Sequence, residues 1–288
     1  ILAGFRAKQF DFAGGPITSD NVLSIAQSTG SPAALSGQQA CEFAIAMRGD
    51  KAPYNDVRVR QAISLAMDRD AIKKFEGRGT VDLLPLAWTY AFDQMPTDVS
   101  PYYKHDVAQA KQLMAAAGYA NGFDMELDYY PYSQVFDEEA ASLQQNWAQI
   151  GIRVKINSME YTAWSNMYGA RKTKFNDAAI GFNESTTTFE SDWLAHMDPR
   201  SPTNFGYIDD PQVTALIDKI NVELDATARR SLYLQVWNFE ANNVYRAGVP
   251  EPPGVYIVSA KLGGALRTKA EALPTFGNQA VEQVWLAS

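Results

Sequence analysis

Acidic pairs, one cysteine and two histidines are the residues of this chain with the most reactive chemistry. The pairs Glu138–Glu139 and Asp209–Asp210 are of the type with which glycosidases flank a glycosidic bond. Adjacent residues on a helix point about 100° apart, so neither pair converges on one substrate atom. Both pairs fit better as solvated acids in the first turn of a helix, where they complement its dipole. A glycoside-active enzyme is therefore the weakest of the alternatives.

Nucleophilic and metal chemistry have even less support. Cys41 lies in QACEF, without the residues that follow a protease cysteine, and His105 and His196 are the only histidines. Two imidazoles are a poor basis for a metal site, and the sequence has no GxSxG, Walker or zinc motif. We expect Cys41 to be a small buried residue in a strand. The sequence predicts no enzyme, no cofactor and no metal.

Composition limits the class of partner. The chain has 288 residues, 46% of them hydrophobic, and a formal net charge of -8 at pH 7. That size and apolar content suit one or two globular domains. The acidic balance argues against nucleic acid as the partner, because no basic surplus neutralises phosphates. Tyrosine and tryptophan are plentiful, and both residues favour recognition surfaces as well as cores.

Helices and strands alternate along the chain. In 53–72, PYNDVRVRQAISLAMDRDAI, apolar residues recur with helical spacing behind a cap at Asp56, and Asp68 caps a second short helix. Period-two patterns predict strands in CEFAIAM, FDMELDYYPY, IRVKINSME and DAAIGF. Further helices are expected in HDVAQAKQLMAAAGY, in EEAASLQQNWAQIGI, near Trp164, from Asp209 to Ile220, and in ARRSLYLQVWNFEANNV. This order indicates an α/β fold.

The same stretches carry a resemblance. NDVRVRQAISLAMDRDAI, then YYKHDVAQAKQLMAAAGYANGFDMEL, then LQQNWAQIGIRVKI, with ARRSLYLQVWNF and AVEQVWL near the end, resemble the extracellular solute-binding proteins of family 5. These are the oligopeptide-, dipeptide-, nickel- and oligosaccharide-binding components of ABC importers. The resemblance implies a periplasmic-binding-protein-like fold of class II. The chain would correspond to the C-terminal half, or slightly more, of such a protein.

The resemblance also implies a division of the chain. Residues 1–46 would be a returning segment of the first lobe, 47–249 the second lobe (domain III), and 250–288 the C-terminal crossover back to the first lobe. The rest of the first lobe, a signal peptide and a lipoprotein cysteine would lie upstream of Ile1. We therefore expect an extracytoplasmic, lipid-anchored protein, which is a monomer. Arg58, Arg60 and Asp68 are expected to make structural hydrogen bonds.

The function implied is capture of a solute between two closing lobes for delivery to a membrane permease, with no bond made or broken. The chain departs from the peptide-binding pattern at two places. Ser185, with Glu184 beside it, stands where peptide binders carry an Asp for the α-ammonium. Tyr130 stands where dipeptide binders carry an Arg for the α-carboxylate. Losing both ion pairs counts against a di- or tripeptide.

Aromatic and neutral polar residues stand in their place. Flat rings stack on sugar faces, and Asn and Thr hydrogen-bond hydroxyls. We predict a neutral ligand, with an oligosaccharide first and a longer peptide held by its backbone second; a third possibility is a lone interaction domain. Strand alternation requires about half of Tyr129, Tyr130 and Tyr132 to face the core. The predicted ligand-binding residues are Trp88, Tyr90, Tyr130, Tyr132, Phe182, Asn183, Glu184, Ser185 and Thr186.

Overall fold

The computed structural model describes residues 2–9, 12–15, 28, 33–36, 41–76, 100–131, 134–169, 174–184, 194–250, 254–258, 262–264 and 284–286. The chain forms two compact units. The larger unit holds the described residues of 41–72 and 100–250, and the smaller unit holds those of 2–36, 73–76 and 254–286. The lobe boundaries predicted at 46/47 and 249/250 stay predictions.

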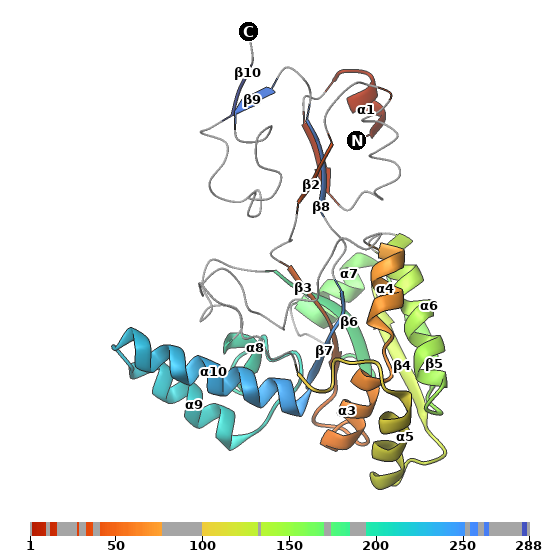
Figure 1. Ribbon diagram of the computed structural model, residues 1–288, viewed down its shortest axis with the longest axis vertical. Coiled ribbons are helices and arrows are strands. Elements are labelled where there is room, and N and C mark those ends of the chain that lie inside the picture. Colours follow the sequence, from red (N-terminus) through yellow and green to blue (C-terminus); the bar gives the residue numbers. More distant parts are fainter. Residues whose placement is uncertain are drawn as a thin grey trace. The chain divides into compact units, whose positions relative to one another are not determined.

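The smaller unit pairs the two ends of the chain. Strands β1 (Phe12–Gly15) and β2 (Ala33–Ser36) both lie antiparallel to β8 (Gly254–Val258), in the order β1-β8-β2. A second antiparallel pair joins β9 (Leu262–Gly264) to β10 (Val284–Leu286). Helix α1 (Leu2–Arg6) precedes β1 (Figure 1).

The larger unit contains a five-stranded mixed sheet, in the order β5-β4-β6-β3-β7 (Figure 1). Three strands are parallel, and β3 runs antiparallel to both of its neighbours. The strands are β3 (Cys41–Met47), β4 (Asp124–Tyr129), β5 (Arg153–Ser158), β6 (Ala178–Glu184) and β7 (Arg246–Gly248). The predicted α/β class is confirmed, and so is the strand that holds Cys41.

The helices begin largely where the sequence predicts. Asp56 accepts a hydrogen bond from the Arg58 amide at the start of α3 (Val57–Leu65), and Asp68 accepts one from Ala71 in α4 (Arg69–Glu76). Asp side chains at the N-cap also accept amide bonds at the starts of α5, α9 and α10, each satisfying a donor that the helix leaves unpaired. These helices are α5 (Val107–Ala116), α9 (Pro211–Val222) and α10 (Ala226–Asn243), and the others are α6 (Gln134–Ala148), α7 (Tyr161–Trp164) with a π-helical turn (Ser165–Gly169), and α8 (Ala195–Met197).

Alternation along the strands sends side chains to two apolar layers. Ile45 and Ile180 belong to a buried cluster that they share with α3, α5 and α6. The neighbouring Ala46 and Ala179 belong to another cluster, which includes Trp164. The indole nitrogen of Trp147 donates to the Ile63 carbonyl at 3.0 Å and links α6 to α3. The central strands are therefore covered on both faces. The α9–α10 hairpin has an apolar cluster of its own.

Two glycines allow the turns before β4 and β5 to touch. Gly122 has a φ of +68°, and Gly151 has a φ of +84°. A Cβ built on Gly122 would lie 1.7 Å from the Gly151 carbonyl oxygen, so no larger residue fits there. This close approach places the first residues of β4 and β5 opposite each other.

The prediction of a solvated first-turn pair at Glu138–Glu139 is wrong. Helix α6 begins at Gln134, so both residues lie beyond its first turn. Glu138 is exposed, but Glu139 is only 4% exposed, and burial raises the pKa of Glu139 to about 8. Glu139 lies four residues before Leu143 and eight before Trp147, so it shares their buried side of the helix, whereas Glu138 points away. The other pair also lies outside the first turn, because α9 begins at Pro211, but there the solvated position holds for Asp209, which is exposed, and Asp210 caps the helix.

Arg69 links three segments of the larger unit. Its guanidinium donates to the carbonyl oxygens of Gly248 at 2.9 Å, Ser64 at 2.8 Å and Tyr103 at 2.9 Å. The side chain is buried, and burial lowers its pKa to about 10. One cation at the start of α4 therefore joins the end of β7, the end of α3 and the segment before α5. Arg60, also buried, donates to the Tyr54 and Asn243 carbonyls, which confirms its predicted structural role.

We expect Arg69→Met to lower the free energy of unfolding by about 3 kcal/mol, because it removes the buried guanidinium that donates to three carbonyl oxygens and to the Ser64 hydroxyl. Urea denaturation of the chain measures this loss. Arg58→Met is the matched control, because Arg58 is an exposed cation near the start of α3 and pairs with Asp56. Similar losses for the two variants would contradict the role given to Arg69.

Candidate ligand-binding edge of the sheet

The carboxyl ends of the three parallel strands define one edge of the five-stranded sheet. Strands β4 and β5 end side by side at Tyr129 and Ser158, and β6 runs on to Glu184 beyond its last pairing with β4 at Ala179. In open α/β sheets, ligands bind outside the carboxyl ends of the strands. This carboxyl edge is therefore the candidate ligand-binding site.

Tyr130, the predicted counterpart of a carboxylate-binding Arg, follows β4 directly and lies in an aromatic group. Its ring centroid is 5.2 Å from that of Tyr161 and 6.2 Å from that of Trp164. Trp164 is buried, Tyr130 is half-buried, and Tyr161 is 55% exposed. These three residues form an aromatic cluster that runs from the core to the surface at the carboxyl edge.

Tyr129 belongs to the opposite face, as strand alternation requires. It is buried in the apolar cluster shared with α6, and its hydroxyl donates to Asp137 at 2.6 Å. Burial, followed by the hydrogen bond to Asp137, raises the pKa of Tyr129. The structure thus confirms that neighbouring tyrosines divide between the two faces.

The other predicted ligand-binding residues stay predictions. The backbone of Phe182, Asn183 and Glu184 forms the end of β6, opposite Phe43, Glu42 and Cys41 of β3, but their side chains lie outside the description. Five residues lie outside the described part of the chain altogether: Trp88, Tyr90, Tyr132, Ser185 and Thr186.

Tyr161 was missed by the sequence analysis. The sequence predicted a helix near Trp164 after the strand that became β5, so the position of Tyr161 just beyond a strand end was available as a signal. No signal in the sequence indicated that Tyr161 would be exposed, because its exposure depends on how Tyr130 and Trp164 pack against it.

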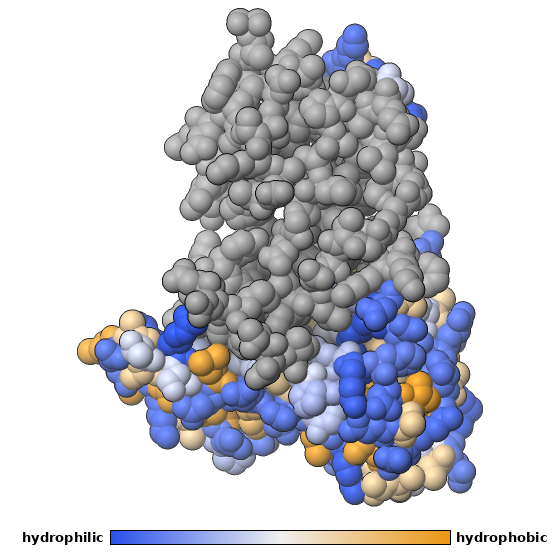
Figure 2. Space-filling model, in the orientation of Figure 1, coloured by the Kyte–Doolittle hydropathy of each residue, from blue (hydrophilic) through white to orange (hydrophobic). Residues whose placement is uncertain are grey.

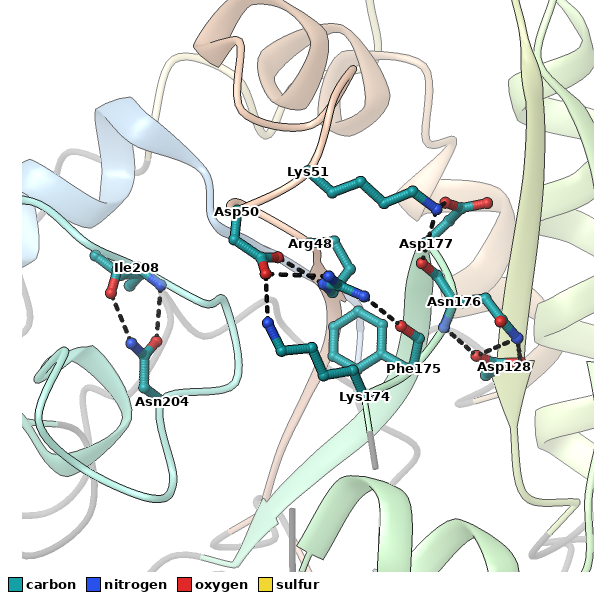
Figure 3. A network of polar contacts seen from close by, with 10 residues as sticks. All are labelled: Arg48, Asp50, Lys51, Asp128, Lys174, Phe175, Asn176, Asp177, Asn204 and Ile208. Carbon is teal, nitrogen blue, oxygen red and sulfur yellow. Dashed lines mark hydrogen bonds and ion pairs between the residues drawn. The ribbon is translucent and has the colours of Figure 1, made fainter. Parts of the chain in front are cut away.

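The amino ends of the same strands form an edge of different chemistry. Arg48 donates to Asp50 and, at 2.9 Å, to the Phe175 carbonyl, and Lys174 donates to Asp50 at 2.6 Å (Figure 3). Burial favours a raised pKa for Asp50, but hydrogen bonds from Arg48 and Lys174 outweigh it and lower the pKa to about 2. These ion pairs join the end of β3 to the segment before β6.

Polar side chains continue this network to the carboxyl half of β4, because the first residues of β6 pair with Leu127 and Asp128. Buried Asp128 accepts hydrogen bonds from the Asn176 amide at 2.7 Å (Figure 3) and from Asn157 at 2.6 Å. Asp177 accepts one from the Glu126 amide at 2.8 Å. The network fixes the positions of β4, β5 and β6 relative to one another.

A hollow of about 630 Å³ lies beside this network at the amino edge. The charged side chains that line it pair with one another: Lys51 with Asp177, Arg153 with Asp124, and Lys155 with Glu126. Since each lining charge already has a partner of opposite sign, the hollow offers no unmatched charge to a ligand. We assign it a structural role.

The two edges also differ in their cations. Among the described residues of the sheet and the segments next to its strand ends, Lys and Arg lie at the amino edge: Arg48, Lys51, Arg153, Lys155, Lys174 and Arg246. The described segments after β4 and β5 carry the Tyr130, Tyr161 and Trp164 rings and no Lys or Arg, whereas at the amino edge the Tyr207 ring lies beside Arg48 and Lys174. Within the described ranges, no three His, Cys, Asp or Glu side chains come together as a metal site, and no helix has the length and apolar character needed to cross a bilayer.

A mixed α/β sheet with an aromatic cluster beyond the carboxyl ends of β4 and β5 is an open α/β structure of the type that binds ligands at its strand ends. The sequence profile of the bacterial extracellular solute-binding proteins, family 5, matches residues 1–196. The chain belongs to this family, whose fold is periplasmic-binding-protein-like.

Individual relatives agree with this assignment. The chain is 36% identical over 126 residues to the heme-binding protein A of Haemophilus influenzae, covering 41% of the chain and 22% of that protein. It is 27% identical over 213 residues to the di/tripeptide-binding protein 1 of Pseudomonas aeruginosa, covering 70% and 37%. The crystal structure of the ABC transporter substrate binding protein CtaP from Listeria monocytogenes superposes with a TM-score of 0.82 at 18% identity, covering 99% of this chain and 57% of that one. The chain thus spans well under two thirds of each relative.

We expect Asp50→Asn to lower the free energy of unfolding by about 1 kcal/mol at pH 7. The folded-state pKa of Asp50 is depressed, so its contribution is complete above the unfolded pKa of about 4 and is lost as the pH falls to about 2. The difference between wild type and variant should therefore shrink across that interval in urea denaturation. Asp124→Asn, at an 82% exposed carboxylate of the same edge, is the control. A difference that does not depend on pH would contradict the assignment.

Proposed function

We propose that this chain supplies the ligand-holding lobe of the substrate-binding component of an ABC importer. The solute binds at the carboxyl edge of β4, β5 and β6 and passes unchanged to a membrane permease. The observation that carries this proposal is the aromatic cluster at the carboxyl ends of parallel strands, in a chain of family 5. Domain closure over a bound solute removes it from water, so a few contacts fix its identity.

The ligand we favour is neutral, with an oligosaccharide first. Tyr130 stands where the resemblance to dipeptide binders would place an Arg, and its neighbours are Tyr161 and Trp164. The described cations of the sheet lie at the other edge. A ligand held through its own carboxylate would therefore find no Arg or Lys partner in the described segments after β4 and β5.

A longer peptide held through its backbone is the second candidate. It is favoured by a relative that is 29% identical over 206 residues, covers 67% of this chain, and is named for oligopeptide binding. Backbone recognition needs hydrogen-bond donors and acceptors from strand ends and loops, and it does not require an ion pair at either peptide terminus.

The setting that we propose is extracytoplasmic, with the binding component monomeric and anchored by lipid. The family is one of solute-binding proteins, and we propose that this member likewise acts without catalysis. If the protein acts without catalysis, a solute incubated with it should be recovered chemically unchanged.

The direct test is native mass spectrometry of the full-length gene product, purified gently from its host and then denatured to release bound solute. We expect co-purified masses spaced by hexose or pentose units. Tyr130→Ala should reduce the loaded fraction, and Tyr119→Ala, which removes a half-buried ring that packs on Phe123, should leave it unchanged. A spread of peptide masses would overturn the oligosaccharide and establish the second candidate.

A further inference from the structure

Tyr161 presents a large apolar ring to solvent at the candidate ligand-binding edge. Among the described residues it is the only aromatic side chain that is more than half exposed. On the face of the larger unit seen in Figure 2, the described surface is mostly hydrophilic, with scattered apolar residues. Single apolar residues are common on protein surfaces. An exposed tyrosine just beyond the end of a parallel strand is different, because ligands bind at such strand ends in open α/β sheets.

The segment that carries Tyr161 is fixed to the sheet. The Met159 amide donates to the Tyr129 carbonyl at 3.0 Å, which extends the pairing of β4 and β5, and the Trp164 amide donates to the Glu160 carbonyl at 3.0 Å. Tyr161 is the first residue of α7 and lies three residues after Ser158, the last residue of β5.

The ring of Tyr161 is also supported from below. It meets the Tyr130 ring at 5.2 Å with an interplanar angle of 57°, and Tyr130 in turn lies 6.2 Å from buried Trp164. Tilted ring pairs at such distances are favourable contacts. A ring held in this way loses little conformational freedom when a ligand covers its exposed face, which lowers the cost of binding.

The groups beside Tyr161 select the kind of ligand. Glu160 is the N-cap residue of α7, but its carboxylate makes no capping hydrogen bond, and it is exposed, as is Ser158 at the end of β5. An exposed carboxylate on the residue that precedes Tyr161 disfavours an anionic ligand and can accept hydrogen bonds from hydroxyls. An aromatic peptide side chain would use the ring but would offer no hydroxyl to Glu160, unless it were a tyrosine.

We propose that Tyr161, supported by Tyr130 and flanked by Glu160, is a stacking subsite for a pyranose ring of the solute. The C–H face of the sugar lies on the tyrosine ring, and a sugar hydroxyl donates to the Glu160 carboxylate. This inference rests on the proposed function, because it names the part of the solute that the carboxyl edge recognises.

The test is isothermal titration calorimetry of the full-length gene product with pentamers of β-1,4-linked glucose, α-1,4-linked glucose and β-1,4-linked xylose, and with a nonapeptide. We expect at least one pentamer to bind, and Tyr161→Ala to weaken that binding about tenfold. Tyr161→Phe keeps the ring and should bind within about twofold of wild type. Leu224→Ala, which truncates a 92% exposed apolar residue between α9 and α10, is the control for loss of exposed apolar surface.

The possible outcomes distinguish an error in the stacking subsite from an error in the proposed function. If a pentamer binds and Tyr161→Ala binds it as tightly as wild type, the stacking subsite is wrong and oligosaccharide capture stands. If no pentamer binds, the pyranose subsite and the oligosaccharide ligand are both overturned, and binding of the nonapeptide would leave solute capture itself in place. Thermal unfolding of each variant confirms that an affinity change does not come from loss of the fold.

Discussion

Burial of the central strands on both faces is the constraint on which the larger unit depends. Neighbouring residues of β3 and β6 belong to different apolar clusters, with Ile45 and Ile180 on one side and Ala46 and Ala179 on the other. A sheet covered in this way can meet solvent or ligand only where its strands end. Polar or ligand contacts of the central strands are therefore restricted to the strand ends, and the side chains differ between the amino ends and the carboxyl ends.

The amino edge has charges that neutralise one another, and the carboxyl edge has rings. Ion pairs such as Lys174 with Asp50 join segments that are distant in sequence, and buried Asp128 fixes the segment before β6 to β4 and β5 through asparagines. Each exposed ion pair adds little to the free energy of unfolding, so this network serves mainly to fix the positions of the strands relative to one another. With one edge fixed, the strands deliver Tyr130 and Tyr161 to the other edge in a defined arrangement.

Sequence reasoning succeeded where the determining interaction is local. The caps at Asp56, Asp106 and Asp210 each bond an amide two or three residues away, so a short stretch contains the whole signal. It failed at Glu139 because it treated the two acids as a pair and did not place them relative to the apolar side of α6 formed by Leu143 and Trp147. Tyr161 was missed because its exposure depends on the packing of Tyr130 over Trp164. Of the predicted ligand-binding residues, only Tyr130 has a described side chain, which lies just beyond the end of β4, and its contact with a ligand stays a prediction.

The central claim is that solute binds at the carboxyl edge of β4, β5 and β6. Hydrogen–deuterium exchange of the full-length gene product, compared with its co-purified solute in place and after the solute is removed by denaturation and refolding, tests this claim most directly. The account predicts that bound solute protects amides in 129–131 and 158–162, with no change in 48–51, 124–126 and 174–177. Protection confined to the second set would place the solute at the amino edge and contradict the account.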